Sequence, residues 1–101
     1  MDARYRSFGE FYPFYLSEHC NRTCRRLHFV GSVLVLAVVA TAIVTRDPRW
    51  LIAAPLVGYG FAWVGHFAFE KNRPATFKYP LYSLMGDWVM FRDILTGRIP
   101  F

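Results

Sequence analysis

Two long uncharged stretches dominate the pattern of hydrophobic and polar positions in this chain. Residues 27–45 and residues 50–69 carry no charged side chain, and a helix over either would be about 28–30 Å long. The hydrocarbon core of a bilayer needs about 20 apolar residues of helix. The pattern therefore predicts two transmembrane spans. Asp47 and Pro48 between them are typical of a tight turn, so we expect the spans to form an antiparallel hairpin.

Shorter amphipathic segments flank the hairpin. Residues 5–16 repeat aromatic side chains at helical spacing, and we expect Pro13 to interrupt this helix. The aromatic side chains are expected to anchor the protein at the membrane surface, and a lid for lipid access is the alternative. Residues 80–96 keep helical spacing but are too short and too charged for a third span. We therefore expect one all-α membrane domain over residues 1–101, a two-span transmembrane helical hairpin with amphipathic interfacial helices at both ends.

Composition and charge agree with this topology. Hydrophobic residues make up 54% of the chain, and the formal net charge is +5. Five basic residues precede the first span and five follow the second, whereas only Arg46 and Arg49 lie between the spans. The positive-inside rule then places both termini in the cytoplasm. Because topology explains the basic residues, we expect no nucleic-acid partner. The alternative is a soluble bundle, but two fully apolar helices leave too little polar chain to cover them.

Counting residues outward from the turn predicts that two of the histidines lie at the same level of the hairpin. The centre lies near Pro48, so His28 is level with about residue 68, and His66 lies within one turn of that level. Both histidines come out near the cytoplasmic surface. His19 can join them only if the chain folds back after it. Asn21 is the predicted N-cap of the first spanning helix, so that helix would begin after His19.

These three residues are all the histidines of the chain. Three imidazoles with nearby carboxylates suit Fe(II), Zn(II) or Mn(II), and three protein ligands leave positions open for substrate and oxygen. The alternative for His19 and His28 is an ordinary interfacial role, whereas a histidine within lipid, such as His66, is costly without a partner. Glu70 follows His66 by one turn. It is the expected catalytic or orienting carboxylate, and simple pairing with a neighbouring cation is its alternative.

Cys20 and Cys24 are the only cysteines. On the cytoplasmic side they are expected to be free thiols. Two thiols do not make a zinc motif, so we expect them to serve packing rather than metal binding.

Three stretches of the chain resemble a known family. Residues 15–21, 26–31 and 65–75 are similar to motifs of the Mpo1-like membrane family, and the last reads Gly-His-Phe-Ala-Phe-Glu-Lys-Asn-Arg-Pro-Ala. The family includes the fungal 2-hydroxy fatty acid dioxygenase, and the resemblance extends from Phe11 to about Leu95. It implies an Fe(II)-dependent enzyme that takes a 2-hydroxy fatty acid and oxygen and yields a fatty acid one carbon shorter.

The resemblance also implies site residues. The iron-binding histidines of the family correspond to His19, His28 and His66. The expected substrate-binding residues are polar side chains within these stretches, and the two arginines are chosen by their charge alone: Arg26, Asn72 and Arg73. This chain lacks the extra membrane segments between the motifs and a further family histidine, and its first two histidines are one residue further apart. A chain this compact is typical of a bacterial member, which places it in the cytoplasmic membrane.

The expected function is therefore fatty acid alpha-oxidation by an integral membrane enzyme. Its cofactor is Fe(II), its partners are molecular oxygen and a membrane lipid or fatty acyl substrate, and a homo-oligomer is a further option. One alternative is a non-enzymatic membrane module that binds lipid or partner helices, with Gly58 and Gly60 allowing close approach. The other is a haem protein with His28 and His66 as axial ligands.

Overall fold

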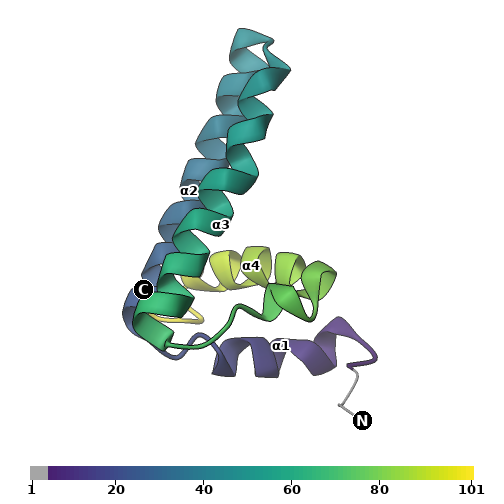
Figure 1. The fold of residues 1–101 in the computed structure, drawn as a ribbon, viewed down its shortest axis with the longest axis vertical. Helices are drawn as coiled ribbons and strands as arrows, with labels where there is room; N and C mark the ends of the chain where they lie inside the picture. Colours follow the sequence, from purple (N-terminus) through teal and green to yellow (C-terminus); the bar gives the residue numbers. More distant parts are fainter. Residues whose placement is uncertain (1–4) are drawn as a thin grey trace.

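The computed structural model describes residues 5–101, and that range is helical with no strand. Two long helices stand side by side as a hairpin, and two shorter helices cross its lower end (Figure 1). The hairpin consists of α2 (Arg22–Thr45) and α3 (Ala53–Val64), and the crossing pair consists of α1 (Phe8–Ser17) and α4 (Pro80–Leu95). The predicted all-α class is thereby confirmed for the described residues.

Three short helical segments complete the chain. The 3₁₀ helix η1 (Pro48–Ile52) leads into α3, the π-helix η2 (Gly65–Glu70) continues it, and the 3₁₀ helix η3 (Ala75–Phe77) precedes α4. The run Pro48–Glu70 has 23 residues and α2 has 24, and both are long and apolar enough to cross a membrane. Insertion into a membrane stays a prediction.

Short polar side chains set the ends of the hairpin helices. Asn21 Oδ1 accepts a hydrogen bond from the Cys24 N–H at 3.1 Å, which confirms the predicted N-cap of α2. At the other end Arg46 adopts the left-handed conformation with φ 55°. Asp47 then caps η1 by accepting the N–H of Arg49 at 3.0 Å. The predicted tight turn is confirmed.

The upper half of the hairpin carries large hydrophobic side chains that the rest of the described chain leaves uncovered. Four of the most exposed lie close to the turn, with exposed fractions from 67% to 81%: Ile43, Val44, Ile52 and Leu56. Transfer of each such side chain from water to an apolar environment is favourable by about 1.5–3 kcal/mol. A lipid-facing surface supplies that environment, and this supports the expected hairpin in a bilayer.

Aromatic side chains form the core between α1 and α4. Phe11 and Tyr15 of α1 are buried against Met90 and Ile94 of α4. Five further rings lie within 6.3 Å of Phe11 between ring centroids: Tyr5, Phe8, Phe14, Tyr79 and Tyr82. The aromatic segment therefore packs against protein on its buried face, which leaves only its outer face for the expected contact with a membrane surface.

The expected interruption of the first helix at Pro13 is wrong, because α1 continues through that residue. A proline inside a helix removes one backbone donor and crowds the carbonyl four residues earlier, here that of Gly9. Pro13 and Gly9 are both exposed, so solvent can satisfy that carbonyl. The burial of Phe11 and Tyr15 on the opposite face then holds the helix in place.

Glycine allows α2 and α3 to approach closely. A Cβ at Gly31 would lie 3.0 Å from Phe61 Cβ, and a Cβ at Gly58 would lie 3.2 Å from Val35 Cγ2. Gly58 therefore allows the close helix approach expected of it, here between α2 and α3. A Cβ at Gly60 would meet no described atom within 4 Å, so this glycine faces no neighbouring helix in the described part of the chain.

Replacement of Gly86 by alanine is expected to lower the free energy of unfolding. An added Cβ would lie 2.8 Å from the ring of Tyr15, and overpacking of this kind costs about 1–3 kcal/mol. Gly60→Ala is the matched control, because its Cβ has free space and both variants gain about 1 kcal/mol of helix propensity. Denaturant unfolding of the detergent-solubilised protein, followed by circular dichroism, measures both variants. Equal stabilities would contradict the close packing of α4 on α1.

Candidate metal centre

The three histidines meet at the base of the hairpin, although each comes from a different segment. His19 lies in the reversal between α1 and α2, His28 lies in α2, and His66 lies in η2. Because α1 ends at Ser17 and α2 begins at Arg22, the chain folds back between the first two histidines, as their convergence requires. The ring centroids of His28 and His66 are 5.0 Å apart, which confirms their predicted equal depth.

The imidazoles face one another through their Nε2 atoms. His19 Nε2 lies 3.1 Å from His28 Nε2 and 2.9 Å from His66 Nε2. The rings are buried, with exposed fractions of 1% for His19, 6% for His28 and 2% for His66. Solvent therefore contributes little to satisfying these nitrogens.

Backbone carbonyls fix the protonation of two of the rings. His19 Nδ1 lies 2.6 Å from the carbonyl oxygen of Tyr15, and His28 Nδ1 lies 2.8 Å from that of Cys24. A carbonyl oxygen only accepts hydrogen bonds, so each Nδ1 must donate. In the neutral imidazole the other nitrogen, Nε2, is then an unprotonated acceptor.

A side-chain amide fixes the third ring. His66 Nδ1 lies 2.7 Å from Asn72 Oδ1. The orientation of this amide follows from its other contacts, because Asn72 Nδ2 donates to the backbone carbonyl of Glu18 at 3.3 Å and to its carboxylate at 3.4 Å. His66 Nδ1 therefore donates to the amide oxygen, and its Nε2 is unprotonated as well.

Three unprotonated nitrogens thus point toward one another without a hydrogen atom between them. Two acceptors this close repel unless a positive charge lies between them. A proton is a poor candidate for that charge, because burial, and then the neighbouring His28 and His66, lower the pKa of His19 well below its ordinary value. A metal ion at the usual distance of about 2.1 Å from each nitrogen fits between atoms spaced in this way.

Cys24 is the fourth side chain of this cluster. Its thiol is free and buried, and the ligand atoms of all four side chains lie within 4.8 Å of one another, so the cluster could hold a metal ion. The Cys24 sulfur lies 3.7 Å from His28 Nδ1, however, the nitrogen that faces away from the other two rings. Cys20 is also free, as predicted, and is exposed.

Glu70 lies at the same end of the hairpin but makes a different contact from the one expected. Its carboxylate accepts the backbone N–H of Asn21 at the start of α2. The partner of the His66 ring is Asn72 instead, whose backbone N–H also donates to the His66 carbonyl at 3.1 Å. The π-helix and the left-handed Lys71 after it bring Asn72 back under the ring. The contact between Glu70 and the Asn21 N–H joins the η2 segment to the start of α2.

The two arginines expected to bind substrate do not line the cavities at the histidines. Arg26 Nε donates to the carbonyl oxygen of Phe101 at 3.2 Å, and its guanidinium lies over the ring of that residue. Arg73 lies over the ring of Phe77. Both side chains are exposed, so any role for them lies at the outer surface of the site.

Tyr15 and Asp87 belong to the site, although the sequence analysis did not identify them. The ring of Tyr15 stacks on His19 with centroids 4.0 Å apart, and its hydroxyl donates to Asp87. Burial raises the pKa of Asp87 to about 6, and the hydrogen bond from Tyr15 opposes part of that rise. The signal available in the sequence was a single acidic residue within the apolar stretch around Met85 and Trp88.

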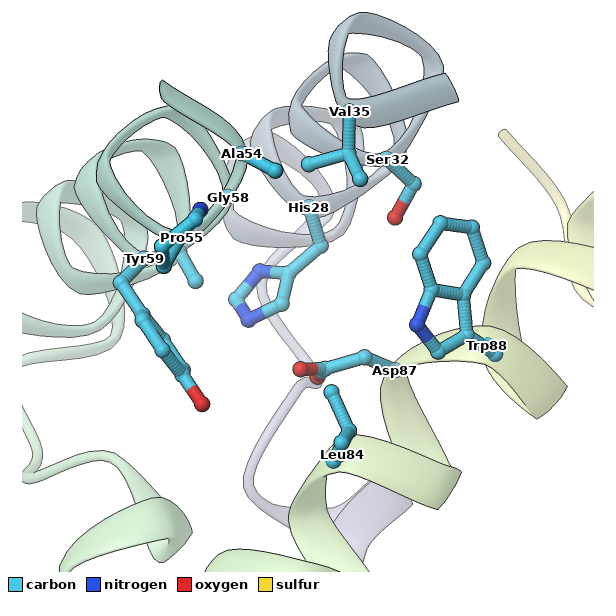
Figure 2. Close-up of a pocket in the computed structure, with 11 residues that line it drawn as sticks. His28, Ser32, Val35, Ala54, Pro55, Gly58, Tyr59, Leu84, Asp87 and Trp88 are labelled. Atoms are coloured by element: carbon cyan, nitrogen blue, oxygen red, sulfur yellow. The ribbon is translucent and has the colours of Figure 1, made fainter. Parts of the chain in front are cut away.

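Two cavities meet at the histidines. The smaller has a volume of about 10 Å³ and touches all three rings. The larger, of about 240 Å³, extends along the hairpin and touches only His28 (Figure 2). Both are lined by His28, Tyr59, Ala62 and Asp87. The small cavity at the nitrogens therefore adjoins the larger cavity between the helices.

Comparison with known proteins agrees with the resemblance seen in the sequence. Residues 5–99 match the family described as Mpo1-like, 2-hydroxy-palmitic acid dioxygenase Mpo1-like. No curated protein and no solved structure matches the chain.

The purified protein is expected to bind a divalent metal ion through the three histidines. His19→Ala, His28→Ala and His66→Ala should each lose most of the bound metal, because each removes one of the converging nitrogens. Cys20→Ala is the control, since its thiol is exposed and points to backbone carbonyls. Elemental analysis after dialysis measures the metal content. Full metal content in all three histidine variants would contradict the shared site.

Asn72→Leu is expected to lower metal affinity by about 10–100-fold, the usual effect of removing the hydrogen-bond partner of a metal-binding histidine. Leucine keeps the volume but cannot accept the His66 Nδ1 proton. Glu18→Ala is the control, because its backbone carbonyl still receives Asn72 Nδ2. Competition with a metal-sensitive dye measures the affinities. Equal affinities in the two variants would mean that Asn72 does not orient His66.

Proposed function

The chain belongs to the Mpo1-like family, and we propose that it shortens 2-hydroxy fatty acids by one carbon with Fe(II) held by His19, His28 and His66. The observation that carries this proposal is the convergence of three unprotonated Nε2 atoms in a buried site. Ferrous iron, when bound, supplies the chemistry by which oxygen reacts with an organic substrate, and three protein ligands leave positions for both.

The overall reaction balances without any further reductant. A 2-hydroxy acid and one molecule of oxygen give the acid one carbon shorter, carbon dioxide and water. The bond between the carboxyl carbon and the hydroxyl-bearing carbon breaks, and oxygen takes up all the electrons released. The protein therefore needs only a metal site, a place for the substrate and a route for protons.

The chain's own residues hold the site in one geometry. The carbonyls of Tyr15 and Cys24 and the amide of Asn72 fix the direction of each imidazole through its Nδ1 proton. We assign Glu70 a positioning role, because its contact with the Asn21 N–H joins the η2 segment to the start of α2. Burial of the rings excludes bulk water from the reacting atoms.

Asp87 is the proposed partner of the substrate hydroxyl. Its carboxylate lines both cavities beside His28, and the Tyr15 hydroxyl holds it in place. With a pKa of about 6, it is mostly ionised at neutral pH and can accept the hydroxyl proton. Arg26 and Arg73 would attract an anionic substrate only at the outer surface, since neither lines the two cavities at the histidines.

The proposed location is a membrane, with the hairpin inserted and both termini on the cytoplasmic side. The two candidate spans and the exposed hydrophobic side chains near the turn support insertion. The balance of basic residues supports the orientation. In a bacterium this membrane would be the cytoplasmic one, and the site would open near its inner surface.

The geometry favours this function over a haem protein. Two axial histidines must leave room between their rings for a porphyrin, whereas His19 Nε2 lies within 3.1 Å of both His28 and His66. A module without metal would leave the three facing nitrogens unexplained.

The test is an aerobic assay of the detergent-purified protein loaded with Fe(II) and given 2-hydroxypalmitic acid. Wild type should consume oxygen and acid in equal amounts and release the acid one carbon shorter, read by mass spectrometry. His66→Ala should abolish the product. Phe67→Ala is the control in the same segment, because its ring is 54% exposed. If metal binds but no product forms, the substrate assignment is wrong, and if no metal binds, the enzyme proposal is wrong.

Asp87→Asn is expected to lower kcat about 100-fold or more while bound iron is retained, because asparagine cannot take up the hydroxyl proton. Tyr15→Phe removes only the hydrogen bond to Asp87 and should have a smaller effect. Steady-state kinetics with parallel metal analysis measure both variants. An Asp87→Asn enzyme with wild-type kcat would remove this residue from the proposed mechanism.

A further inference from the structure

The larger cavity is an elongated groove rather than a rounded pocket. On α3 it is lined by Ala54 and Ala62, eight residues and about 12 Å apart along the helix. On α2 it extends from His28 to Val35, about 10 Å. The groove therefore runs parallel to the hairpin, with one end at the histidines and the other toward the turn.

The two ends of the groove differ in chemistry. The end at the histidines carries His28 and Asp87, whereas the lining residues nearest the turn are Val35, Ala54 and Pro55. Helix α3 presents the small residues Ala54, Gly58 and Ala62 to the groove. A ligand that matches these walls has a polar head and an unbranched apolar tail.

Within residues 5–101, no third segment lines the upper end of the groove. Helix α4 contributes Leu84, Asp87 and Trp88 to the lining, and it crosses only the lower part of the hairpin (Figure 1). Beyond α4 the hairpin exposes hydrophobic side chains such as Leu56 on its other faces. If the hairpin lies in a bilayer, the groove opens sideways into the acyl chains of the lipid.

We propose that this groove binds the alkyl chain of a single-chain 2-hydroxy fatty acid, which enters sideways from the bilayer past α4. The identity of the polar head rests on the proposed function, whereas the position of the tail rests on the groove. The tail lies between α2 and α3, and Ala54 marks the level at which it leaves the protein. Carbons up to that level contact protein, and carbons beyond it remain in lipid. The groove therefore selects for the first part of the chain and not for its total length.

Photolabelling tests the position of the tail without requiring turnover. The probe is 2-hydroxypalmitic acid with a diazirine at mid-chain, added to the protein in phosphatidylcholine nanodiscs. Labelling should concentrate on the groove residues Val35, Ala54 and Gly58, and excess unlabelled 2-hydroxypalmitic acid should reduce it severalfold. Labelling of outward residues such as Leu56 reports random contact with lipid and should resist competition. The absence of competed labelling in the groove would overturn the inference.

A size change at the upper end tests selection. Ala54→Phe should lower kcat/KM for a long-chain 2-hydroxy acid about tenfold relative to a short-chain one, because the added ring fills the space of several methylenes. Ala40→Phe is the matched control. Ala40 lies on α2 as far from Asp47 as Ala54 does on α3, and it is exposed outside the groove. An unchanged ratio in Ala54→Phe, or equal changes in both variants, would overturn the inference.

The two proposals fail separately. Competed labelling of the groove without any oxidation product keeps the alkyl-chain site and rejects the oxidation. Oxidation without competed labelling of the groove keeps the reaction and rejects the position of the tail. Labelling of His66→Ala provides the remaining comparison, because this variant leaves the groove lining intact and should still be labelled there.

Discussion

Three unprotonated imidazole nitrogens that face one another in a buried space are the constraint on which the rest of this structure depends. Each Nδ1 atom donates to an oxygen that can only accept at that position, so no proton remains for the inner side. Buried polar atoms without partners are costly. The fold accepts this arrangement where its segments meet, and a cation bound there would satisfy all three nitrogens together.

Most irregular features of the chain hold the three histidines in position. The reversal between α1 and α2 turns His19 toward His28, and the π-helix at the end of the hairpin turns His66 toward both. Asn72 and Glu70 then link this end of the hairpin to the reversal, through Glu18 and through the N–H of Asn21. The regular hairpin needs none of these features to cross a membrane, which indicates that they are there for the site.

The crossing pair of helices divides the molecule into two environments. Below, α1 and α4 bury an aromatic core and bring Tyr15 and Asp87 against the histidines. Above, the hairpin is left with hydrophobic side chains outward and a groove between its helices and α4. The proposed reaction between oxygen and a lipid-like substrate would need both environments in contact, a polar site shielded from water and an apolar path that leads to it.

The amino-acid sequence by itself determined the all-helical hairpin, its turn, the N-cap at Asn21 and the common level of His28 and His66. These follow from local rules, because run length, capping chemistry and the rise per residue do not depend on distant contacts. Only the tertiary structure decided that Asn72 rather than Glu70 holds the His66 ring, since a π-turn shifts the register that an α-helix predicts. Tertiary contact likewise carried α1 through Pro13 and joined Tyr15 to Asp87, which lie 72 residues apart in the chain. Pairings across such separations depend on how helices pack, and packing is set by the shapes of all the side chains together.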